Sequence, residues 1–349
     1  MPKRVLHICD NLYYGGAQMV MIATINELPE FEHFVVYLAK YEELKPMIKC
    51  PSYFIEQKPG IKILSTVKQV RRFVKDNSID IIHCNVFNSM MIGRAVAFLS
   101  PSVKQITTYH GMSYLPSLPG SKKWAFIDKF LYKKRFINIA VSQTVKNHLL
   151  EQISRHRKIE VVTNSVSNEF FSAEKKTFDL FKPTLKFVTI ANNFPLKNIK
   201  YLLDVFSNLE EDKFELHIYG GRMEPLIEKT TQLKNVFFYG IQPIKGDLLK
   251  QYDIYISSSL TEGCPLSVME AMAIGLPTPL STIDAFKEIT DNRGFFFDPY
   301  DTDSGKNELK KIYGNQYLLK EFSKHNFEVA KNFSPSIFAE KIRNIYLKK

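Results

Sequence analysis

Short runs of β-branched and aromatic residues alternate with helical patterns along the whole chain of 349 residues. This alternation is typical of βαβ units, in which parallel strands form a sheet and helices cover its faces. The strands expected in the first half are Arg4–Cys9, Phe34–Leu38, Ile79–His83, Gln105–Tyr109, Asn138–Val141 and Ile159–Val162. The rhythm then restarts, with strands expected at Leu185–Ala191, Phe214–Tyr219, Asn235–Phe238, Ile254–Ser257 and Gly294–Phe297. We therefore predict two doubly wound α/β domains whose ligands bind at the carboxyl ends of the strands.

A segment without clear periodicity separates the two halves. It extends from Ser167 to Pro183 and is rich in polar residues, Lys175 and Lys176 among them. Polar, irregular segments of this kind connect domains. The sequence thus predicts a linker there, between a domain over residues 1–166 and a second over 167–333. A closing helix is expected within residues 334–349.

The composition excludes several classes of protein. No apolar run reaches the roughly 18 residues that cross a bilayer, and the best candidate, Met90 to Leu99, contains Arg94. The apolar run that follows Arg4 is too short for a signal peptide. The four cysteines, at positions 9, 50, 84 and 264, have the spacing of neither a zinc site nor a disulfide framework. We expect a cytoplasmic protein without a metal site.

The positive charge is concentrated in the first half of the chain. Residues 1–170 carry 23 Lys and Arg against 13 Asp and Glu, whereas residues 171–349 carry 24 against 23. A net charge of +10 on one half suggests an acidic partner, either an anionic membrane surface or nucleic acid. The alternative is a basic surface that only favours solubility.

The strongest chemical signal follows the strand expected at Ile254–Ser257. A helix is predicted from about Pro265 to Ile274, because proline suits a first helical turn and Gly275 marks a stop. Its N-terminal amides can accept an anion. The motif around this helix begins Thr261-Glu262-Gly263-Cys264-Pro265-Leu266 and continues to Glu270, Ala271, Ala273, Gly275 and Pro277. Two carboxylates at this spacing can bind hydroxyls at opposite ends of an elongated ligand; the alternative is an acidic cap and an exposed helix glutamate.

At these residues the chain resembles the retaining glycosyltransferases of family 4, which have the GT-B fold of two Rossmann-like domains with a cleft between them. Their signature is two glutamates separated by seven residues and an Ala-x-(Ala/Ser)-x-Gly-x-Pro tail. Smaller matches extend the resemblance over most of the chain, at Val141-Ser142, Asn164-Ser165-Val166 and Phe333-Ser334. It implies an N-terminal acceptor domain, a C-terminal donor domain and a closing helix that crosses back to the first domain.

A second match concerns the donor phosphates. Ala191 to Asn198 aligns with the family pattern Gly-Arg-Leu-x-x-x-Lys-Gly, which places Lys197 against the donor pyrophosphate. The arginine of that pattern is Asn192 here, so one cation is missing. The Gly15-Gly16-Ala17-Gln18 loop resembles a Gly-Gly-Ala-Glu loop of the family, although a simple turn is the default reading of such a sequence.

The remaining site candidates also follow expected strands. The resemblance places His110, of His110-Gly111, against the donor sugar, and assigns Gly220, Tyr239 and Gly240 to base-binding and phosphate-side loops. Strand-to-helix turns would explain these last three equally well. The frequent second histidine of the family is Asn85 here, and His83 is interpreted as structural.

One segment of the first half combines apolar and basic residues. An apolar loop from Met112 to Gly120 leads into a helix with Trp124, Ile127 and Leu131 on one face. The basic residues around that face are Lys122, Lys123, Lys129, Lys133, Lys134 and Arg135. Such a segment suits the surface of an anionic membrane. A buried apolar face with a solvated basic back is the alternative.

The expected function is transfer of a sugar, with retention, from a nucleotide-diphosphate donor to a glycan or lipid-linked acceptor, in bacterial surface polysaccharide synthesis. The resemblance implies a UDP-sugar as substrate, no cofactor and no metal, with His110, Lys197 and Glu262 as catalytic residues. Cys264, Leu266 and Glu270 would bind the donor with the loop residues named above. A GT-B nucleotide-sugar epimerase and a nucleic-acid-binding protein remain alternatives; a nicotinamide-dependent dehydrogenase would need a G-x-G-x-x-G turn, which is absent.

Overall fold

The computed structural model describes residues 1–57, 63–115, 121–153, 158–172, 176–177, 179, 181–228 and 230–348. They divide into two compact units. The N-unit comprises Met1–Ser165 and Pro335–Lys349, and the C-unit comprises Val166–Ser334. The chain therefore changes units after Ser165, ahead of the linker predicted at 167–183. That segment belongs to the C-unit because it forms α6 (Asn168–Ser172), which contacts α10 and buries Phe170.

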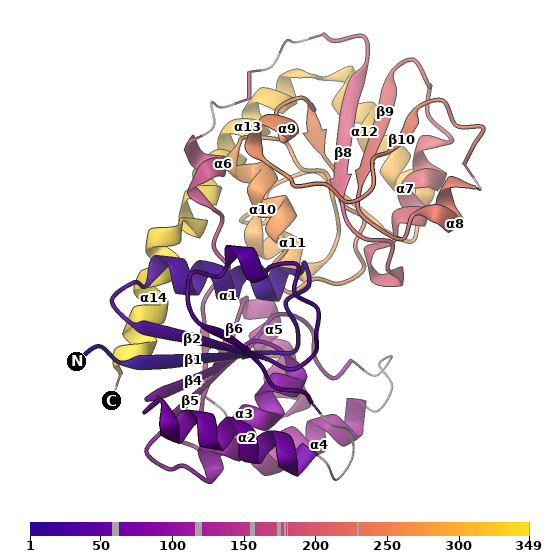
Figure 1. The fold of residues 1–349 in the computed structure, drawn as a ribbon. Helices are drawn as coiled ribbons and strands as arrows, with labels where there is room; N and C mark the ends of the chain where they lie inside the picture. Colours follow the sequence, from indigo (N-terminus) through magenta and orange to yellow (C-terminus); the bar gives the residue numbers. More distant parts are fainter. Residues whose placement is uncertain are drawn as a thin grey trace. The chain divides into compact units, whose positions relative to one another are not determined.

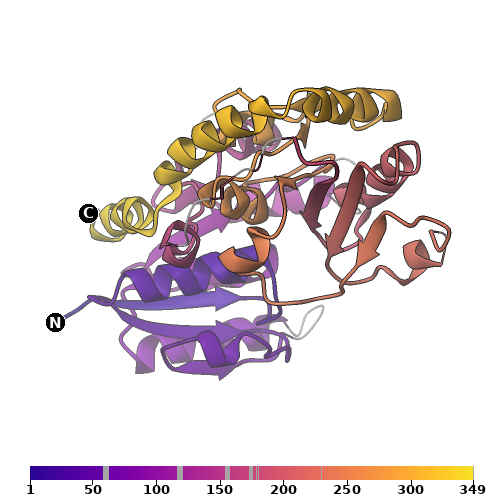
Figure 2. The ribbon, with the colours of Figure 1, turned by 90° about the horizontal axis from the view of Figure 1, so that it is seen from above.

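The N-unit is built on a parallel sheet with the strand order β3-β2-β1-β4-β5-β6-β7 in its described residues. The arrowheads of its strands point the same way in Figure 2. Its strands are β1 (Arg4–Cys9), β2 (Glu32–Tyr37), β3 (Ser52–Phe54), β4 (Ile81–Cys84), β5 (Lys104–Tyr109), β6 (Ile137–Ala140) and β7 (Ile159–Val161). Its helices are α1 (Gly16–Glu27), α2 (Ile63–Asp76), α3 (Phe87–Phe98), α4 (Ser121–Leu131), α5 (Gln143–Gln152) and α14 (Pro335–Leu347). Figure 1 shows α1 on one face of the sheet and α2, α3 and α4 on the other.

The C-unit repeats this architecture with a sheet of order β10-β9-β8-β11 and a parallel pair β12-β13. A bridge between Ser257 and Leu280 connects the two. Its strands are β8 (Leu185–Ile190), β9 (Phe214–Tyr219), β10 (Val236–Phe238), β11 (Ile254–Tyr255), β12 (Leu280–Ser281) and β13 (Phe296–Phe297). Its other helices are α7 (Ile199–Phe206), α8 (Glu224–Ile227), α9 (Gly246–Leu249), α10 (Leu266–Ala273), α11 (Asp284–Ile289), α12 (Thr302–Gly314) and α13 (Tyr317–Ala330). The prediction of two doubly wound parallel-sheet domains is confirmed.

Alternation along the strands places the core of the C-unit. In β9, Leu216 and Ile218 are buried in one apolar cluster with Phe187 of β8, while Glu215 and His217 point to the opposite face. Two short strands, β3 and β12, were not predicted from the sequence.

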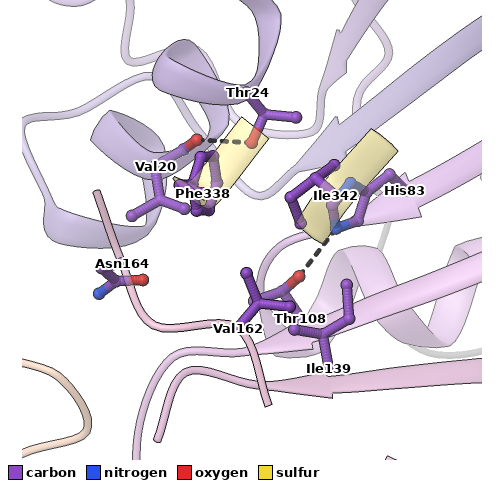
Figure 3. A pocket seen from close by; sticks show the side chains of 9 residues that line it. All are labelled: Val20, Thr24, His83, Thr108, Ile139, Val162, Asn164, Phe338 and Ile342. Carbon is purple, nitrogen blue, oxygen red and sulfur yellow. Dashed lines mark hydrogen bonds between the residues drawn. The ribbon is translucent and has the colours of Figure 1, made fainter. Parts of the chain in front are cut away.

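The last helix, α14, packs on the sheet of the N-unit and contacts α1. Its Phe338 and Ile342 line a narrow cavity with His83 and Thr108 (Figure 3), and this cavity has no room for a water molecule. Tyr346 is fully buried, and its hydroxyl shares a 2.7 Å hydrogen bond with His83 Nδ1. Thr108 Oγ1 lies 2.8 Å from the other ring nitrogen of His83. The closing helix is thus fixed to β4 and β5 by a buried polar chain.

We predict that Tyr346→Phe destabilises the protein, because it leaves one buried nitrogen of His83 without its partner. An unsatisfied buried group costs about 1 to 3 kcal/mol. Tyr313→Phe is the matched control: its hydroxyl donates to Pro183 O at an exposed position, where water can replace the lost bond. Thermal unfolding of the full chain should show a clear loss for Tyr346→Phe and a small one for Tyr313→Phe. Equal losses would contradict a buried anchor.

Candidate functional site

Two of the predicted site residues form an ion pair in the C-unit. Lys197 is the last residue of a short 3-10 helix, Pro195–Lys197, which follows β8. Glu262 lies in the loop after β11. Because β8 and β11 are neighbouring parallel strands, their carboxyl ends lie at one edge of the sheet. Lys197 Nζ lies 2.6 Å from Glu262 Oε1, and Ser259 Oγ donates to the same oxygen at 2.7 Å. The structure therefore brings a cation and a carboxylate together where the sheet binds ligands.

The helix predicted after Glu262 is α10, which begins at Leu266 with Pro265 in the N-cap position. Gly263 precedes it, and the buried Cys264 thiol lies 3.3 Å from the sulfur of Met269. At the other end, Gly275 has a φ of 83° and lets the amide of Leu276 return to Ala271 O at 2.9 Å. The helix thus presents the amides of its first turn directly after the ion pair.

Glu270 lies within α10, and burial raises its pKa to about 7, with a further contribution from the nearby carboxylate of Glu169 on α6. The pKa of this carboxyl is therefore shifted towards neutral pH. Both Glu262 and Glu270 also raise the pKa of Tyr255, after the larger effect of its burial. The two glutamates of the motif consequently flank one buried tyrosine, whose hydroxyl donates to Ser267 at 2.8 Å.

Three loops at the same edge of the sheet are joined by backbone contacts. Gly220, after β9, donates its amide to Gly240 O, after β10, at 2.8 Å. Gly220 has a φ of 146°, and a Cβ atom there would lie 2.0 Å from Ala191 O, so only glycine fits. Asn192, after β8, accepts the amide of Gly221 on its Oδ1 at 2.7 Å. Its carboxamide oxygen is therefore engaged within the protein.

Tyr239, which precedes Gly240, is part of an aromatic stack beside these loops. Its ring stacks on Tyr219 at 4.7 Å between centroids, and its hydroxyl shares a 2.9 Å hydrogen bond with His217 Nδ1. The ring is partly exposed, with 38% of the residue accessible. A flat, fixed aromatic surface is thus available next to Gly240.

In the N-unit, Gly15 and Gly16 lie where the loop after β1 enters α1. Gly15 is the N-cap residue of α1, and Gly16 is its first residue. A Cβ atom on Gly15 would lie 2.6 Å from Gln18 Oε1, and the amide group of Gln18 itself donates to Asn11 Oδ1 at 3.1 Å. Gln18 therefore fixes the glycine loop to the end of β1.

His110, after β5, lines a cavity of about 170 Å³ in the N-unit. Burial lowers the pKa of His110 to about 4, so the ring is neutral at physiological pH. Neither ring nitrogen has a hydrogen-bond partner among the described residues, and neither does Nδ2 of Asn85, which follows the neighbouring strand β4 and is only 2% exposed. Asn85 was not predicted to be a site residue. Its position directly after a strand that neighbours β5 could have identified it. The remaining lining residues are uncharged: Val86, Phe87, Met90, Thr107, Thr108, Tyr109, Gly111 and Ser113.

A buried ion pair lies beneath this cavity. Arg94 of α3 and Asp128 of α4 are both fully buried and hydrogen-bonded to each other. The Asp128 carboxylate also accepts the hydroxyls of Tyr109, at 2.9 Å, and Tyr114, at 2.6 Å. Arg94 donates in addition to Asn138 Oδ1 at 2.8 Å. These bonds hold α4 and the segment after His110 against the sheet.

The pair also shows which side of α4 faces the protein. Asp128, rather than an apolar stripe alone, faces the protein, while Phe126 and Phe130 are 70% and 77% exposed. The helix ends at Leu131, and the basic residues at 133–135 lie beyond it. Of the loop predicted at 112–120, residues 116–120 lie outside the described part of the chain.

Two further side chains lie away from these groups. His83, which the sequence analysis interprets as structural, is hydrogen-bonded on both ring nitrogens. Asp301 is exposed and caps α12 by accepting the amide of Asp303. The described residues contain no cluster of three or more His, Cys, Asp or Glu that could hold a metal ion. Within the same part of the chain, no helix is long and apolar enough to cross a membrane.

Known protein families account for most of the chain. Residues 14–170 match the profile described as Glycosyltransferase Family 4, and residues 171–329 match that of Glycosyl transferases group 1. The chain belongs to glycosyltransferase family 4. This glycosyltransferase has the GT-B fold. The Val166 amide donates to Phe333 O at 2.9 Å, so two of the smaller family matches meet where the chain changes units.

Its curated relatives are distant but extend over most of its length. A UDP-Gal:alpha-D-GlcNAc-diphosphoundecaprenol alpha-1,3-galactosyltransferase of Escherichia coli is 22% identical over 309 residues, 82% of this chain and 80% of the relative. The O-antigen biosynthesis glycosyltransferase WbnH of Escherichia coli is 26% identical over 270 residues, 75% and 77% of the two chains. Among solved structures, HepE of Anabaena in complex with UDP and glucose covers 99% of each chain with a TM-score of 0.85 and 16% identity. That likeness concerns the fold.

We predict that the Glu270 carboxyl of this glycosyltransferase titrates near pH 7, protonated below that pH and charged above it. Replacing Glu169 by Gln removes a neighbouring negative charge and should lower the midpoint. The measurement is NMR of protein labelled with ¹³C at glutamate carboxyls, with the Glu270 signal assigned by its loss in Glu270→Gln. Glu228→Gln, an exposed substitution at the end of α8, is the control and should leave the midpoint unchanged. A midpoint near 4.5 in the unmodified protein would show that Glu270 is hydrated.

Proposed function

We propose that this glycosyltransferase moves a sugar from a nucleoside-diphosphate donor, with UDP as its nucleotide, to a glycan or lipid-linked acceptor, and that the anomeric configuration is retained. The observation that carries the proposal is the pairing of Lys197 with Glu262 directly ahead of the N-terminus of α10. A diphosphate leaving group gains negative charge as the glycosidic bond breaks. A lysine and the amides of a helix N-terminus are suited to stabilise that charge.

The roles of the C-unit residues follow from their chemistry. Lys197 acts on the pyrophosphate as a point charge, and Glu262 accepts hydroxyls of the transferred sugar. Glu270, when ionised, accepts the two ribose hydroxyls. The amides of Gly263, Cys264 and Leu266 face the phosphates, and the exposed ring of Tyr239 lies beside the base. No resident cofactor takes part in this scheme, in which the leaving phosphate itself assists deprotonation of the acceptor hydroxyl.

The N-unit contributes a site of different polarity. Within the described part of the chain, Nδ2 of Asn85 and both ring nitrogens of the neutral His110 have no hydrogen-bond partner, and these residues line a cavity without charged side chains. Buried polar groups without partners are costly unless a ligand satisfies them. Hydroxyl groups can do so, whereas a carboxylate would meet no countercharge there. We therefore assign the cavity to a hydroxyl-bearing, uncharged part of a substrate.

The relatives suggest the biological setting. The Escherichia coli relatives are named for a diphosphoundecaprenol acceptor and for O-antigen biosynthesis. We extend these names to propose that the acceptor here is a surface polysaccharide precursor, made on the cytoplasmic side of a membrane.

The direct test is incubation of the protein with radiolabelled UDP-, GDP- and ADP-sugars, followed by counting of the sugar hydrolysed or transferred. The expected result is turnover of a UDP-sugar. Lys197→Ala should lower kcat as well as raise KM, because an interaction that strengthens in the transition state contributes to kcat. The matched control is Lys234→Ala, which removes an exposed lysine before β10, at the opposite end of the same strands. It should leave both constants unchanged.

Two outcomes would contradict this account. A Lys197→Ala variant with unchanged kcat and a raised KM would mean that the lysine binds donor and transition state equally. Absence of turnover and of binding with all three donor classes would contradict the nucleotide-sugar function itself.

The N-unit also carries a surface that suits an anionic membrane. We propose that it binds there through Phe126 and Phe130 of α4. The same segment of the chain carries six exposed cations: Lys122, Lys123, Lys129, Lys133, Lys134 and Arg135. Near an anionic surface each exposed cation contributes about 1 kcal/mol, so a few together give reversible binding. Arg135 contributes least in this scheme, because its guanidinium donates to Ala97 O and Pro101 O.

Co-sedimentation with liposomes tests this surface. Binding to anionic vesicles should be strong at 0.1 M salt and largely lost at 1 M, where the Debye length falls from about 10 Å to about 3 Å. Replacing Phe126 and Phe130 by Ser should weaken it. The control pair, Tyr300→Ser with Tyr317→Ser, removes two exposed rings from the C-unit and should not. Equal binding to neutral and anionic vesicles, or none to either, would refute membrane docking.

A further inference from the structure

The charges in the proposed donor site do not balance a diphosphate. Lys197 is paired with Glu262, so the two side chains together carry no net charge. Asn192 is neutral, and its carboxamide oxygen already accepts the amide of Gly221. A bound diphosphate has at least two negative charges. The proposed function, on which this inference rests, therefore needs a second cation at the same edge of the sheet.

Arg222 is placed to supply it. It follows Gly220 and Gly221 in the loop after β9, the strand next to β8. Its guanidinium carbon lies 4.6 Å from the ring centroid of Phe194, which belongs to the loop after β8. Phe194 O in turn accepts the amide of Lys197 at 2.9 Å. One aromatic residue thus connects the arginine with the turn that carries the lysine.

The position of Arg222 is fixed by its backbone. Its carbonyl accepts Asn193 Nδ2 at 3.0 Å, and the preceding Gly221 O accepts the Asn193 amide at the same distance. Arg222 has a φ of 65°, in the left-handed region that is unfavourable for residues other than glycine. An arginine therefore occupies a backbone conformation that glycine would adopt more easily.

The side chain is available to a ligand. Arg222 is exposed, and in the described part of the chain no carboxylate lies within ion-pair distance of its guanidinium. Stacking on Phe194 occupies the flat face of the guanidinium and leaves the N–H groups at its edge free. Those groups match two oxygens of a phosphate at once.

We propose that Arg222 is the second cation of the donor site and binds the diphosphate of the nucleotide, in place of the arginine that position 192 lacks. Arg222 reaches the ligand from the loop after β9, while Lys197 reaches it from the turn after β8. The carboxylate of Glu262 is then free to leave Lys197 and accept sugar hydroxyls without loss of positive charge around the phosphates.

The test compares the affinities of UDP and of uridine, measured by calorimetry and by competition, in single variants of the full chain. Arg222→Gly removes the guanidinium and relieves the left-handed backbone, so a loss of affinity cannot arise from strain. It should weaken UDP roughly 10- to 100-fold, the range for hydrogen bonds to charged groups, and leave uridine unchanged. Arg222→Lys keeps the charge without the planar fork and should weaken UDP less. Lys234→Ala again serves as the control of equal charge.

The outcomes separate this inference from the proposed function. If Lys197→Ala weakens UDP and Arg222→Gly does not, Arg222 is not the second cation and the proposed donor site stands. If Arg222→Gly weakens UDP and uridine equally, the arginine shapes the loop rather than binding phosphate, and the inference is again overturned. If the unmodified protein binds none of UDP, GDP and ADP, both the inference and the proposed function fail.

Discussion

The chemistry of the C-unit depends on one ion pair, between Lys197 and Glu262, which ties the turn after β8 to the loop after β11. Because a hydroxyl of Ser259 also donates to the paired oxygen, the carboxylate is held in place without a ligand. The pair keeps a lysine and a glutamate side by side ahead of the N-terminus of α10. The positive end of the helix dipole attracts the carboxylate and repels the ammonium group. In the proposed donor site, a diphosphate competes with the carboxylate for the lysine. In the proposed reaction, donor binding therefore both places the cation on the leaving group and releases the acid to bind sugar hydroxyls.

In both units the proposed ligand groups follow the carboxyl ends of parallel strands, but these groups are charged in the C-unit and neutral in the N-unit. Parallel pairing brings the carboxyl ends of neighbouring strands to one edge of each sheet, and every proposed ligand group follows such an end. In the C-unit these ends carry Lys197 and Arg222, which suit a charged diphosphate, and Glu262, which suits sugar hydroxyls. In the N-unit they carry Asn85 and the neutral His110, and neither Nδ2 of Asn85 nor the ring nitrogens of His110 have a hydrogen-bond partner among the described residues. Tyr109, which lines that cavity, is hydrogen-bonded to the buried pair of Arg94 and Asp128, whose charges already balance each other. The division matches a reaction in which one partner is a nucleotide and the other a chain of hydroxyl groups.

The sequence predicted the fold class and most of the strands, because buried parallel strands are apolar runs separated by helical periods. It also selected Lys197 and Glu262, since each belongs to a recognisable motif. Their direct contact was not predictable, because it depends on β11 lying next to β8 rather than on spacing in the chain. Periodicity alone did not identify the buried face of α4: a charged residue, Asp128, lies on the buried side, where Arg94 on another helix pairs with it. Arg222 escaped sequence analysis for a similar reason, since its relation to Phe194 exists only once β8 and β9 are paired.

The central claim is that this glycosyltransferase transfers sugar with retention at a diphosphate site, and the configuration of the product tests it most directly. Proton NMR of the first product formed from an α-linked nucleotide sugar, with any suitable acceptor, gives the anomeric configuration from the coupling of its H1 signal. The account predicts an α-linked product, formed as nucleoside diphosphate accumulates in equal amount. A β-linked product would contradict it, because inversion requires a base on the opposite face of the sugar and assigns no role to the leaving phosphate.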